Sequence, residues 1–173
     1  QDVISPEFKE AGNRVIHLKA EIDENNLPKT DSLLSVFEKV NALVKSGKAK
    51  AIYTPCFGGI AEAIMKMGFG NGFGFKFEDG VALSDIFGYS YGSFIVEVTD
   101  DSYMDATLGY VTCDSKITYK GEAVSADELL KLYEEKLEPI FSCNIKTEGK
   151  KYENFSFKAN ERYKTAFKCA KPK

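Results

Sequence analysis

The most informative segment for the fold is residues 49–67, which read AKAIYTPCFGGIAEAIMKM. The run Ala49–Thr54 predicts a short strand, and the proline that follows has no N–H to give to a sheet, so the chain should leave the sheet there. Gly58 and Gly59 then precede an apolar helical stretch, Ile60–Met67. A strand, a glycine pair and a helix in this order expose backbone N–H groups at a helix N-terminus, where they can hold a phosphate.

The residues before this stretch predict a strand and a long helix. The strand covers Val15–Leu18 and follows a Gly-Asn turn signal. The helix covers Asp31–Ser46, with Thr30 or Asp31 as its N-cap and Gly47 placed to end it. Its predicted apolar face carries residues at helical spacing: Leu33, Phe37, Val40 and Val44, with Leu34 beside them.

The residues after this stretch predict further strands and two more helices. One strand should carry a buried aromatic face, because three phenylalanines alternate with other residues: Phe73, Phe75 and Phe77. A capping box of Ser125 and Glu128 predicts a helix over Ala126–Leu137, which Pro139 should end. The other predicted elements are a short helix over Val81–Phe87 and strands over Ser93–Val98, Thr107–Thr112, Ile117–Tyr119 and Glu122–Val124. We therefore predict an α+β fold, a mixed β-sheet with packed helices.

The composition is that of an ordinary globular protein. Of the 173 residues, 43% are hydrophobic and 28% charged, which excludes collagen-like, coiled-coil and fully disordered chains. No apolar run reaches the ~20 residues of a membrane span, and the first residues do not show the pattern of a signal peptide. We predict a cytoplasmic protein with no membrane partner. Because the chain begins with Gln1 rather than Met, we also expect it to be part of a longer protein.

The net charge of −3 is unevenly distributed. Residues 146–173 contain nine Lys/Arg and three Asp/Glu, a local charge of +6, so residues 1–145 carry −9. We interpret 1–145 as the folded domain and 146–173 as a basic linker. A basic tail can bind an anionic partner. A polar linker, or an arm lying across its own acidic domain, explains the same charge, and we predict no nucleic-acid partner.

The cysteines and the histidine do not form a pattern for metal or covalent chemistry. The four cysteines (Cys56, Cys113, Cys143 and Cys169) are scattered and His17 is alone, so no zinc-ligand spacing exists. The scatter favours reduced thiols. A Cys–His nucleophile pair through His17 would need an orienting carboxylate that the sequence does not identify, and a satisfied or exposed strand histidine is the plainer interpretation. We predict no metal, no disulfide and no catalytic residue.

Two segments resemble a known superfamily in their order and spacing. The first is 51–63 (AIYTPCFGGIAEA), followed by 67–70 (MGFG) and Gly74; the second is 85–96 (DIFGYSYGSFIV). They resemble the C-terminal domain of the aminoimidazole ribonucleotide synthetase superfamily. That domain typically has a strand ending in His-Asp, Gly-Gly-Leu at a helix start, and a Glu-Ser-Gln-Gly-Arg-like turn. With the opening 3–9 and the closing 171–173, the whole chain is similar to the second such domain of single-chain phosphoribosylformylglycinamidine synthases.

The resemblance implies a reaction for the parent enzyme. Formylglycinamide ribonucleotide, ATP and glutamine would become formylglycinamidine ribonucleotide, ADP, phosphate and glutamate in purine biosynthesis. ATP would activate the amide oxygen by phosphoryl transfer, ammonia from a glutaminase domain would displace the phosphate, and magnesium would offset the nucleotide charge. The implied partners are the neighbouring nucleotide-binding and glutaminase domains of the same chain, and 146–173 would lead into the glutaminase domain.

The chain departs from the superfamily pattern where that pattern carries polar side chains. The His-Asp pair is Tyr53-Thr54 here, and the Glu-Ser-Gln-Gly-Arg turn is 89–93 (YSYGS). These replacements remove carboxylates that could hold magnesium and an arginine that could bind phosphate, whereas the glycines are present. We therefore predict a non-catalytic domain that keeps the fold. Two alternatives stay open: a stand-alone nucleotide- or phosphate-binding module, and a domain of another ATP-dependent synthetase of the superfamily.

Four residues are the candidate cofactor-binding residues: Gly58, Gly59, Ser90 and Gly92. Main-chain N–H groups of the glycine pair could hold a phosphate, and Ser90 and Gly92 could orient a substrate group. The plainer interpretation is structural: close packing of a helix on a strand for the pair, and a turn before a core strand for the other two. The sequence itself assigns no cofactor to this domain.

Overall fold

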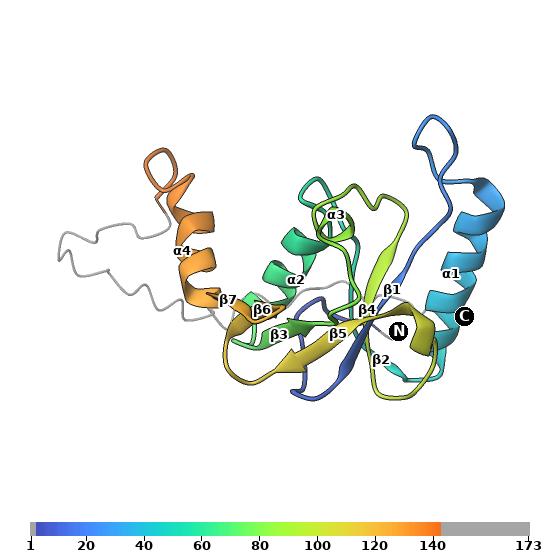
Figure 1. Ribbon diagram of the computed structural model, residues 1–173, viewed down its shortest axis with the longest axis horizontal. Helices are drawn as coiled ribbons and strands as arrows, with labels where there is room; N and C mark the ends of the chain where they lie inside the picture. Colours follow the sequence, from blue (N-terminus) through green and yellow to red (C-terminus); the bar gives the residue numbers. More distant parts are fainter. Residues whose placement is uncertain (1–2, 143–173) are drawn as a thin grey trace, which may run out of the picture.

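A seven-stranded sheet forms the centre of the molecule, and the computed structural model describes it over residues 3–142 (Figure 1). The strands are β1 (Arg14–Leu18), β2 (Ala49–Tyr53), β3 (Gly74–Phe77), β4 (Phe94–Val98), β5 (Thr107–Thr112), β6 (Lys116–Tyr119) and β7 (Glu122–Ser125). Their order is β2-β4-β1-β5-β3-β6-β7. Neighbours are antiparallel except β3 and β6, which are parallel. The predicted α+β class with a mixed sheet is confirmed.

The helices lie where the sequence predicts them. They are α1 (Thr30–Lys45), α2 (Gly59–Phe69), the single-turn α3 (Leu83–Ile86) and α4 (Ala126–Glu135), with a short 3-10 helix at Met104–Ala106. None of these helices combines the length and apolar composition that a membrane span needs. Cys143, Cys169 and the predicted linker 146–173 lie outside the described residues.

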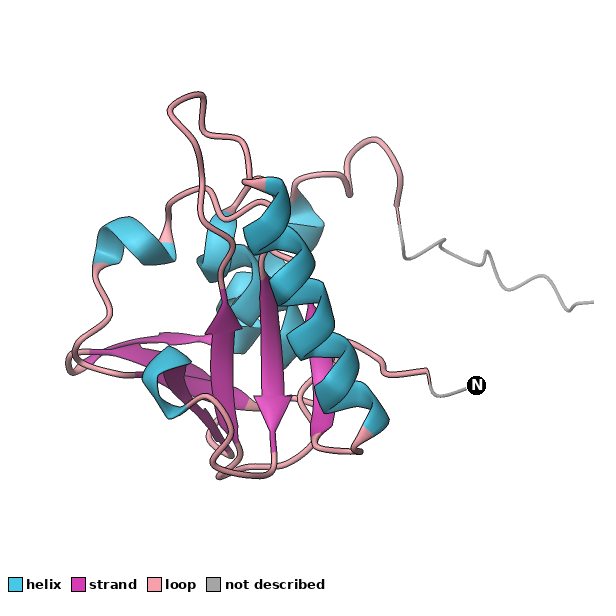
Figure 2. Ribbon diagram, turned by 90° about the vertical axis from the view of Figure 1, so that its right-hand side faces the viewer, coloured by secondary structure: helices cyan, strands magenta, loops and turns pink. Residues whose placement is uncertain are grey.

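The alternation of side chains along β1 and β4 divides the core between the two faces of the sheet. Val15 and Ile95 belong to the cluster that packs against α2, and the next residue on each strand belongs to the cluster that packs against α1. Figure 2 shows the long helix α1 lying alongside the strands. Because side chains alternate with a period of two, His17 lies on the same face of β1 as Val15, the face of α2.

The predicted aromatic strand is confirmed. Phe75 and Phe77 of β3 are buried and meet edge to face with ring centroids 4.8 Å apart. Phe8 stacks on Phe75 at 5.8 Å, and the half-buried Phe73 packs against the same cluster. Aromatic pairs in such geometries add roughly 0.5–1.5 kcal/mol each to the effect of burial, so this cluster anchors the N-terminal segment to the sheet.

Helix α1 differs from its predicted form in its cap and in part of its buried face. Its N-cap is Lys29, with no capping side chain, so the expected cap at Thr30 or Asp31 is wrong. Three residues of the predicted face, Leu33, Val40 and Val44, pack against the core cluster of this side of the sheet, so that part of the prediction is confirmed. The most deeply buried residues of the helix are Val36 and Leu43, whereas Leu34 and Phe37 are exposed. The face that meets the sheet therefore overlaps the predicted one but is rotated toward Val36 and Leu43. Gly47 ends the helix with φ +71°, as predicted.

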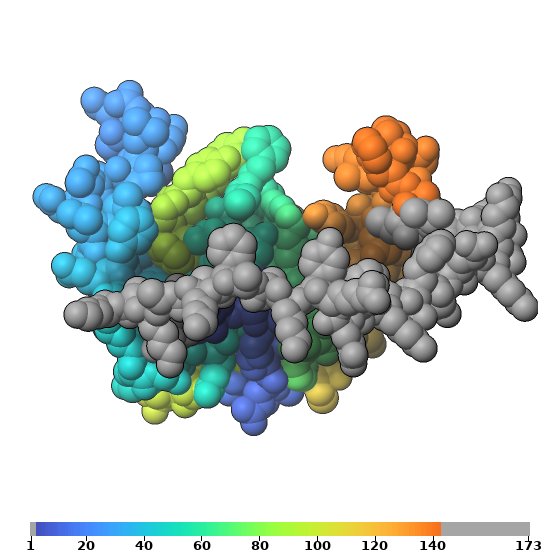
Figure 3. All heavy atoms as spheres, turned by 180° about the vertical axis from the view of Figure 1, so that it is seen from behind, coloured from blue at the N-terminus to red at the C-terminus, as the bar shows by residue number. Residues whose placement is uncertain are grey.

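Helix α4 stands at the end of the molecule opposite to α1 (Figure 3). The hydroxyl of Ser125 accepts a hydrogen bond from the backbone N–H of Asp127 at 3.2 Å, so the predicted cap is confirmed. The helix ends at Glu135, before Pro139, and its buried residue is Ala126. Two large apolar side chains at this end, Tyr133 in the helix and Leu137 just after it, are exposed. An apolar groove of about 590 Å³ is lined by residues of α2, α3, β6, β7 and α4.

Candidate functional site

The glycine pair forms the turn into α2, as the sequence predicts. Gly58 is the N-cap, and Gly59, at φ +66°, donates its N–H to the carbonyl of Cys56 at 3.1 Å. A Cβ on Gly59 would lie 2.5 Å from the carbonyl oxygen of Gly88, which comes from the turn after α3. Both the left-handed conformation and the close approach of two backbones therefore require glycine here.

The side chain of Glu62 occupies the anion-binding position of this turn. Its carboxylate accepts a hydrogen bond from the Gly58 N–H at 2.7 Å and pairs with the ammonium of Lys66. The hydrogen bond from Lys66, followed by that from the Gly58 N–H, lowers the pKa of Glu62, and the pKa of Lys66 is raised in turn. A carboxylate at a helix N-terminus is favoured by the same partial positive charge that would attract a phosphate. A phosphate held by Gly58 would therefore have to displace Glu62.

Ser90 and Gly92 belong to the turn before β4 but face different surroundings. The backbone carbonyl of Ser90, which is buried, accepts hydrogen bonds from the N–H and the hydroxyl of Ser93 at 3.2 and 2.6 Å. Gly92 has φ +75°, and a Cβ there would meet Pro28 and Leu33 at 3.0 Å. The four candidate residues therefore do not line one site: the glycine pair opens α2, Ser90 lines a cavity, and Gly92 packs toward α1.

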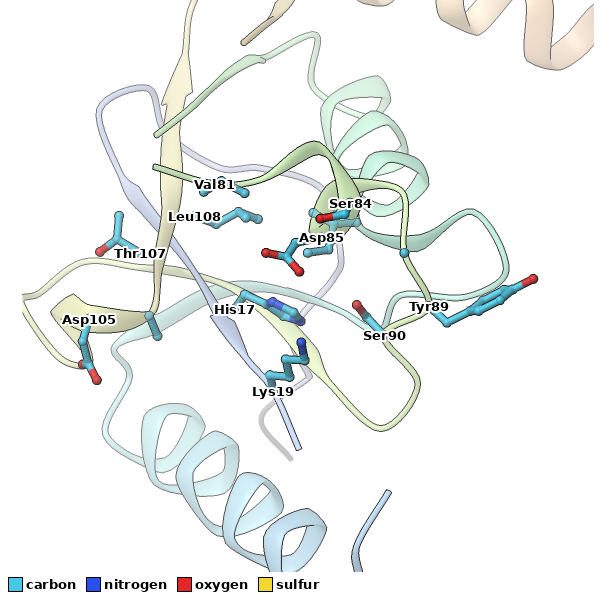
Figure 4. A pocket seen from close by; sticks show the side chains of 13 residues that line it. His17, Lys19, Val81, Ser84, Asp85, Tyr89, Ser90, Asp105, Thr107 and Leu108 are labelled. Atoms are coloured by element: carbon cyan, nitrogen blue, oxygen red, sulfur yellow. The ribbon is translucent and has the colours of Figure 1, made fainter. Parts of the chain in front are cut away.

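The cavity lined by Ser90 measures about 260 Å³ and lies between the end of β1, α3 and the start of β5. Its polar and charged lining includes His17, Lys19, Asp85, Ser90, Asp105 and Thr107 (Figure 4). Ile60 and Leu108, both buried, and the half-buried Val81 add apolar surface. Lys19 and Asp85 are 66 positions apart in the sequence, so no local motif could have indicated this arrangement.

His17 is a satisfied strand histidine, as the plainer interpretation of the sequence has it. Its Nε2 lies 2.9 Å from the hydroxyl of Ser93. The single hydroxyl proton of Ser93 is donated to the Ser90 carbonyl, so His17 Nε2–H is the donor to Ser93 and Nδ1 carries the lone pair. The pKa of His17 is lowered from 6.5 to about 4, mainly by burial and to a smaller extent by the charge of Lys19, while the charge of Asp85 acts in the opposite direction. The imidazole is therefore neutral at pH 7.

Aromatic residues occupy three of the positions where the superfamily pattern has polar side chains, namely Tyr53, Tyr89 and Tyr91. Thr54 is exposed at the end of β2, beside the half-buried Tyr53. Tyr89 and Tyr91 are exposed and stack at 5.7 Å, and Phe57 lies 6.0 Å from the Tyr89 ring. These residues supply no carboxylate for magnesium. Within residues 3–142, no group of three or more His, Cys, Asp or Glu side chains could hold a metal ion.

The described cysteines show no sign of covalent chemistry. Cys56 and Cys113 are exposed free thiols, and the Cys56 thiol contacts the carbonyl of Thr54 at 3.5 Å. His17 has Ser93, not a cysteine, as its hydrogen-bond partner. The site therefore offers hydrogen bonds and charges for binding but no nucleophile with an adjacent base.

Comparison with solved structures finds the same fold inside larger proteins. The crystal structure of phosphoribosylformylglycinamidine synthase II from Thermotoga maritima covers 92% of this chain with a TM-score of 0.59 and 12% identity. T. maritima PurL complexed with FGAR covers 92% with a TM-score of 0.59 and 9% identity. E. coli HypE, a hydrogenase maturation protein, covers 71% with a TM-score of 0.52 and 12% identity.

These likenesses confirm the expected fold, that of an aminoimidazole ribonucleotide synthetase-like domain. At such identities they show the fold alone. The chain spans 31% and 33% of the two T. maritima chains and 51% of HypE. No protein-family model matches the sequence, and no curated protein sequence matches it.

Proposed function

We propose that this chain is a non-catalytic domain of a phosphoribosylformylglycinamidine synthase, an ATP-dependent ligase of purine biosynthesis. The observation that carries the proposal is that a side chain of the domain itself occupies the anion-binding position of the glycine turn. The fold keeps the strand–glycine–helix unit, but the carboxylate of Glu62 accepts the hydrogen bond from the N–H of Gly58. Tyr53-Thr54 replaces the His-Asp pair of the superfamily pattern, so the carboxylate of that pair is missing. A domain of this kind contributes surface and shape to the enzyme, not reacting groups.

The apolar groove beside α4 supports a role in packing against other domains. Leu83 and Phe87 of its lining are exposed, at 54% and 69% of their surface. Large apolar side chains gathered at one groove are typical of surfaces that a partner covers. In the proposed enzyme the partners are the neighbouring nucleotide-binding and glutaminase domains of the same polypeptide, and ATP and magnesium act in other domains of that enzyme.

Binding measurements separate this proposal from a stand-alone nucleotide- or phosphate-binding module. We expect the chain alone to show no turnover of formylglycinamide ribonucleotide with ATP and an ammonia source, and no micromolar affinity for ATP, ADP or that substrate in calorimetric titrations. Turnover, or micromolar affinity, would overturn the proposal. Glu62→Ala is the matched control, because it removes the carboxylate that occupies the Gly58 N–H and leaves both glycines of the turn in place.

The parent gene gives an independent test. A glutaminase domain encoded after this domain would support the proposal, and pull-down of the chain by the separately expressed nucleotide-binding domain would support the packing role. A parent protein without either neighbour would count against the synthase and in favour of another ATP-dependent synthetase with the same fold.

A further inference from the structure

The cavity at the end of β1 is lined by three charged side chains that form no ion pair within residues 3–142, those of Lys19, Asp85 and Asp105. Lys19 and Asp85 both line it, and neither side chain has a hydrogen-bond or ion-pair partner among residues 3–142. Figure 4 shows them on opposite sides of the His17 imidazole. Both act on His17 electrostatically, with opposite signs, so both charges lie near the ring.

The hydrogen-bond chain behind the cavity fixes what His17 can offer to a ligand. Its Nε2–H is used by Ser93, whose own proton goes to the carbonyl of Ser90. Its Nδ1 is left as an acceptor, because a neutral imidazole has one donor and one acceptor nitrogen. The cavity therefore combines a carboxylate and a neutral ring acceptor with an ammonium donor.

The size and the floor of the cavity restrict the ligand further. Its 260 Å³ lies below the roughly 300–1,000 Å³ of pockets for drug-sized ligands, which favours a ligand smaller than a nucleotide. Ile60, Val81 and Leu108 form an apolar part of the lining. A second carboxylate, that of Asp105, also lines the cavity and disfavours ligands with an acidic side chain.

We propose that this cavity binds a free α-amino acid with an uncharged side chain. The ligand ammonium pairs with the carboxylate of Asp85 and donates to His17, and the ligand carboxylate pairs with the ammonium of Lys19. The side chain of the ligand lies against the apolar lining. Each charge of a zwitterion thereby meets an opposite charge that has no other partner in the described chain. The inference does not rest on the proposed function, because it uses no residue of the glycine turn.

His17 is the only histidine of the sequence, so its ring resonances report on this cavity without ambiguity. The test is an NMR titration of the whole chain at pH 7 with L-leucine, isopentylamine (leucine without its carboxylate) and 4-methylpentanoate (leucine without its ammonium). We expect saturable shifts of the His17 ring with L-leucine. Each analogue should bind at least about tenfold more weakly, since each lacks one charge-assisted contact.

Variants assign the effect to the two charges. Asp85→Asn and Lys19→Met should each weaken leucine binding by about tenfold or more, the effect of losing one charge-assisted hydrogen bond. Asp101→Asn and Lys50→Met, which change exposed charges outside the cavity lining, should leave binding unchanged. All four positions are exposed, and circular dichroism verifies that each variant is folded.

Three outcomes would overturn the proposal. The first is the absence of any saturable shift at about 10 mM leucine, at which a site with a Kd of roughly 1 mM would be largely filled. The second is isopentylamine binding as tightly as leucine, which would make the cavity a cation site. The third is 4-methylpentanoate binding as tightly as leucine, which would make it an anion site.

Discussion

His17 should make the domain less stable as the pH falls from 7 to 5. Burial lowers its pKa from 6.5 to about 4, with Lys19 acting in the same direction and Asp85 against it. Between these two values the unfolded chain binds more protons than the folded one, so the free energy of unfolding falls with the pH. The stability that comes from a neutral His17 is fully present above pH 6.5 and is lost as the pH falls toward 4.

The size of the effect follows from the two pKa values. One pKa unit corresponds to about 1.4 kcal/mol, and the linkage relation gives a loss of about 2 kcal/mol between pH 7 and pH 5. His17→Gln is the matched variant: its side-chain amide keeps a donor for the hydroxyl of Ser93 but does not titrate. Urea-induced unfolding at pH 7, 6 and 5 should show the parent losing about 2 kcal/mol more than the variant.

An NMR titration of the single imidazole measures the pKa directly. The window above pH 5 also separates His17 from the carboxyl groups whose pKa values are lowered, such as Glu62 and Asp100, because those groups stay ionised there. Two results would refute the burial of a neutral His17 beside the cavity at the end of β1. One is an imidazole that titrates near 6.5, and the other is a free energy of unfolding that depends on pH in the same way in the parent and in the variant.

Further substitutions test the turns, the buried carboxylate and an exposed position of the superfamily pattern by urea-induced unfolding. Gly59→Ala should cost roughly 2–3 kcal/mol, from its positive φ and a backbone contact. Gly121→Ala, also at positive φ but in open space, should cost only about 1 kcal/mol, and equal losses would show that the contact is unimportant. Glu97→Gln should cost about 2–3 kcal/mol. The fully buried carboxylate of Glu97 accepts three hydrogen bonds, and the glutamine amide would turn an N–H group toward these donors; a variant as stable as the parent would contradict this hydrogen-bond pattern. Thr54→Asp should change stability by less than about 0.5 kcal/mol, since Thr54 is exposed, and a loss above about 1 kcal/mol would show a constraint at that position.

The sequence predicts the elements of this fold well because their signals are local. The turn between β6 and β7 is one example: Lys120 and Gly121 both have positive φ, the geometry of a tight hairpin, and the sequence places the turn there. The order of strands in the sheet has no such signal. β1 lies between β4 and β5, and pairings across so many residues depend on the packing of the whole sheet.

The candidate site was predictable only in part, for the same reason. The position of the Gly58–Gly59 turn follows from the sequence, but its occupation by Glu62 depends on a rotamer that no motif specifies. The cavity at the end of β1 joins Lys19, Asp85 and Thr107, which come from three separate segments. The sequence shows that His17 is the single histidine, but the neutral state of its imidazole results mainly from burial, which depends on the folded sheet.

Different physical constraints fix the residue type at the glycine positions and at the polar positions of the superfamily pattern. Gly59 is fixed by its φ and by the Gly88 carbonyl, so any side chain there strains the backbone, whatever the domain binds. Thr54 and Tyr89 are exposed, so their identity costs the fold little. A chain that has lost the chemistry can therefore keep the glycine half of the pattern. For this fold, a match carried by glycines argues for the backbone geometry, and activity has to be argued from the exposed side chains around it.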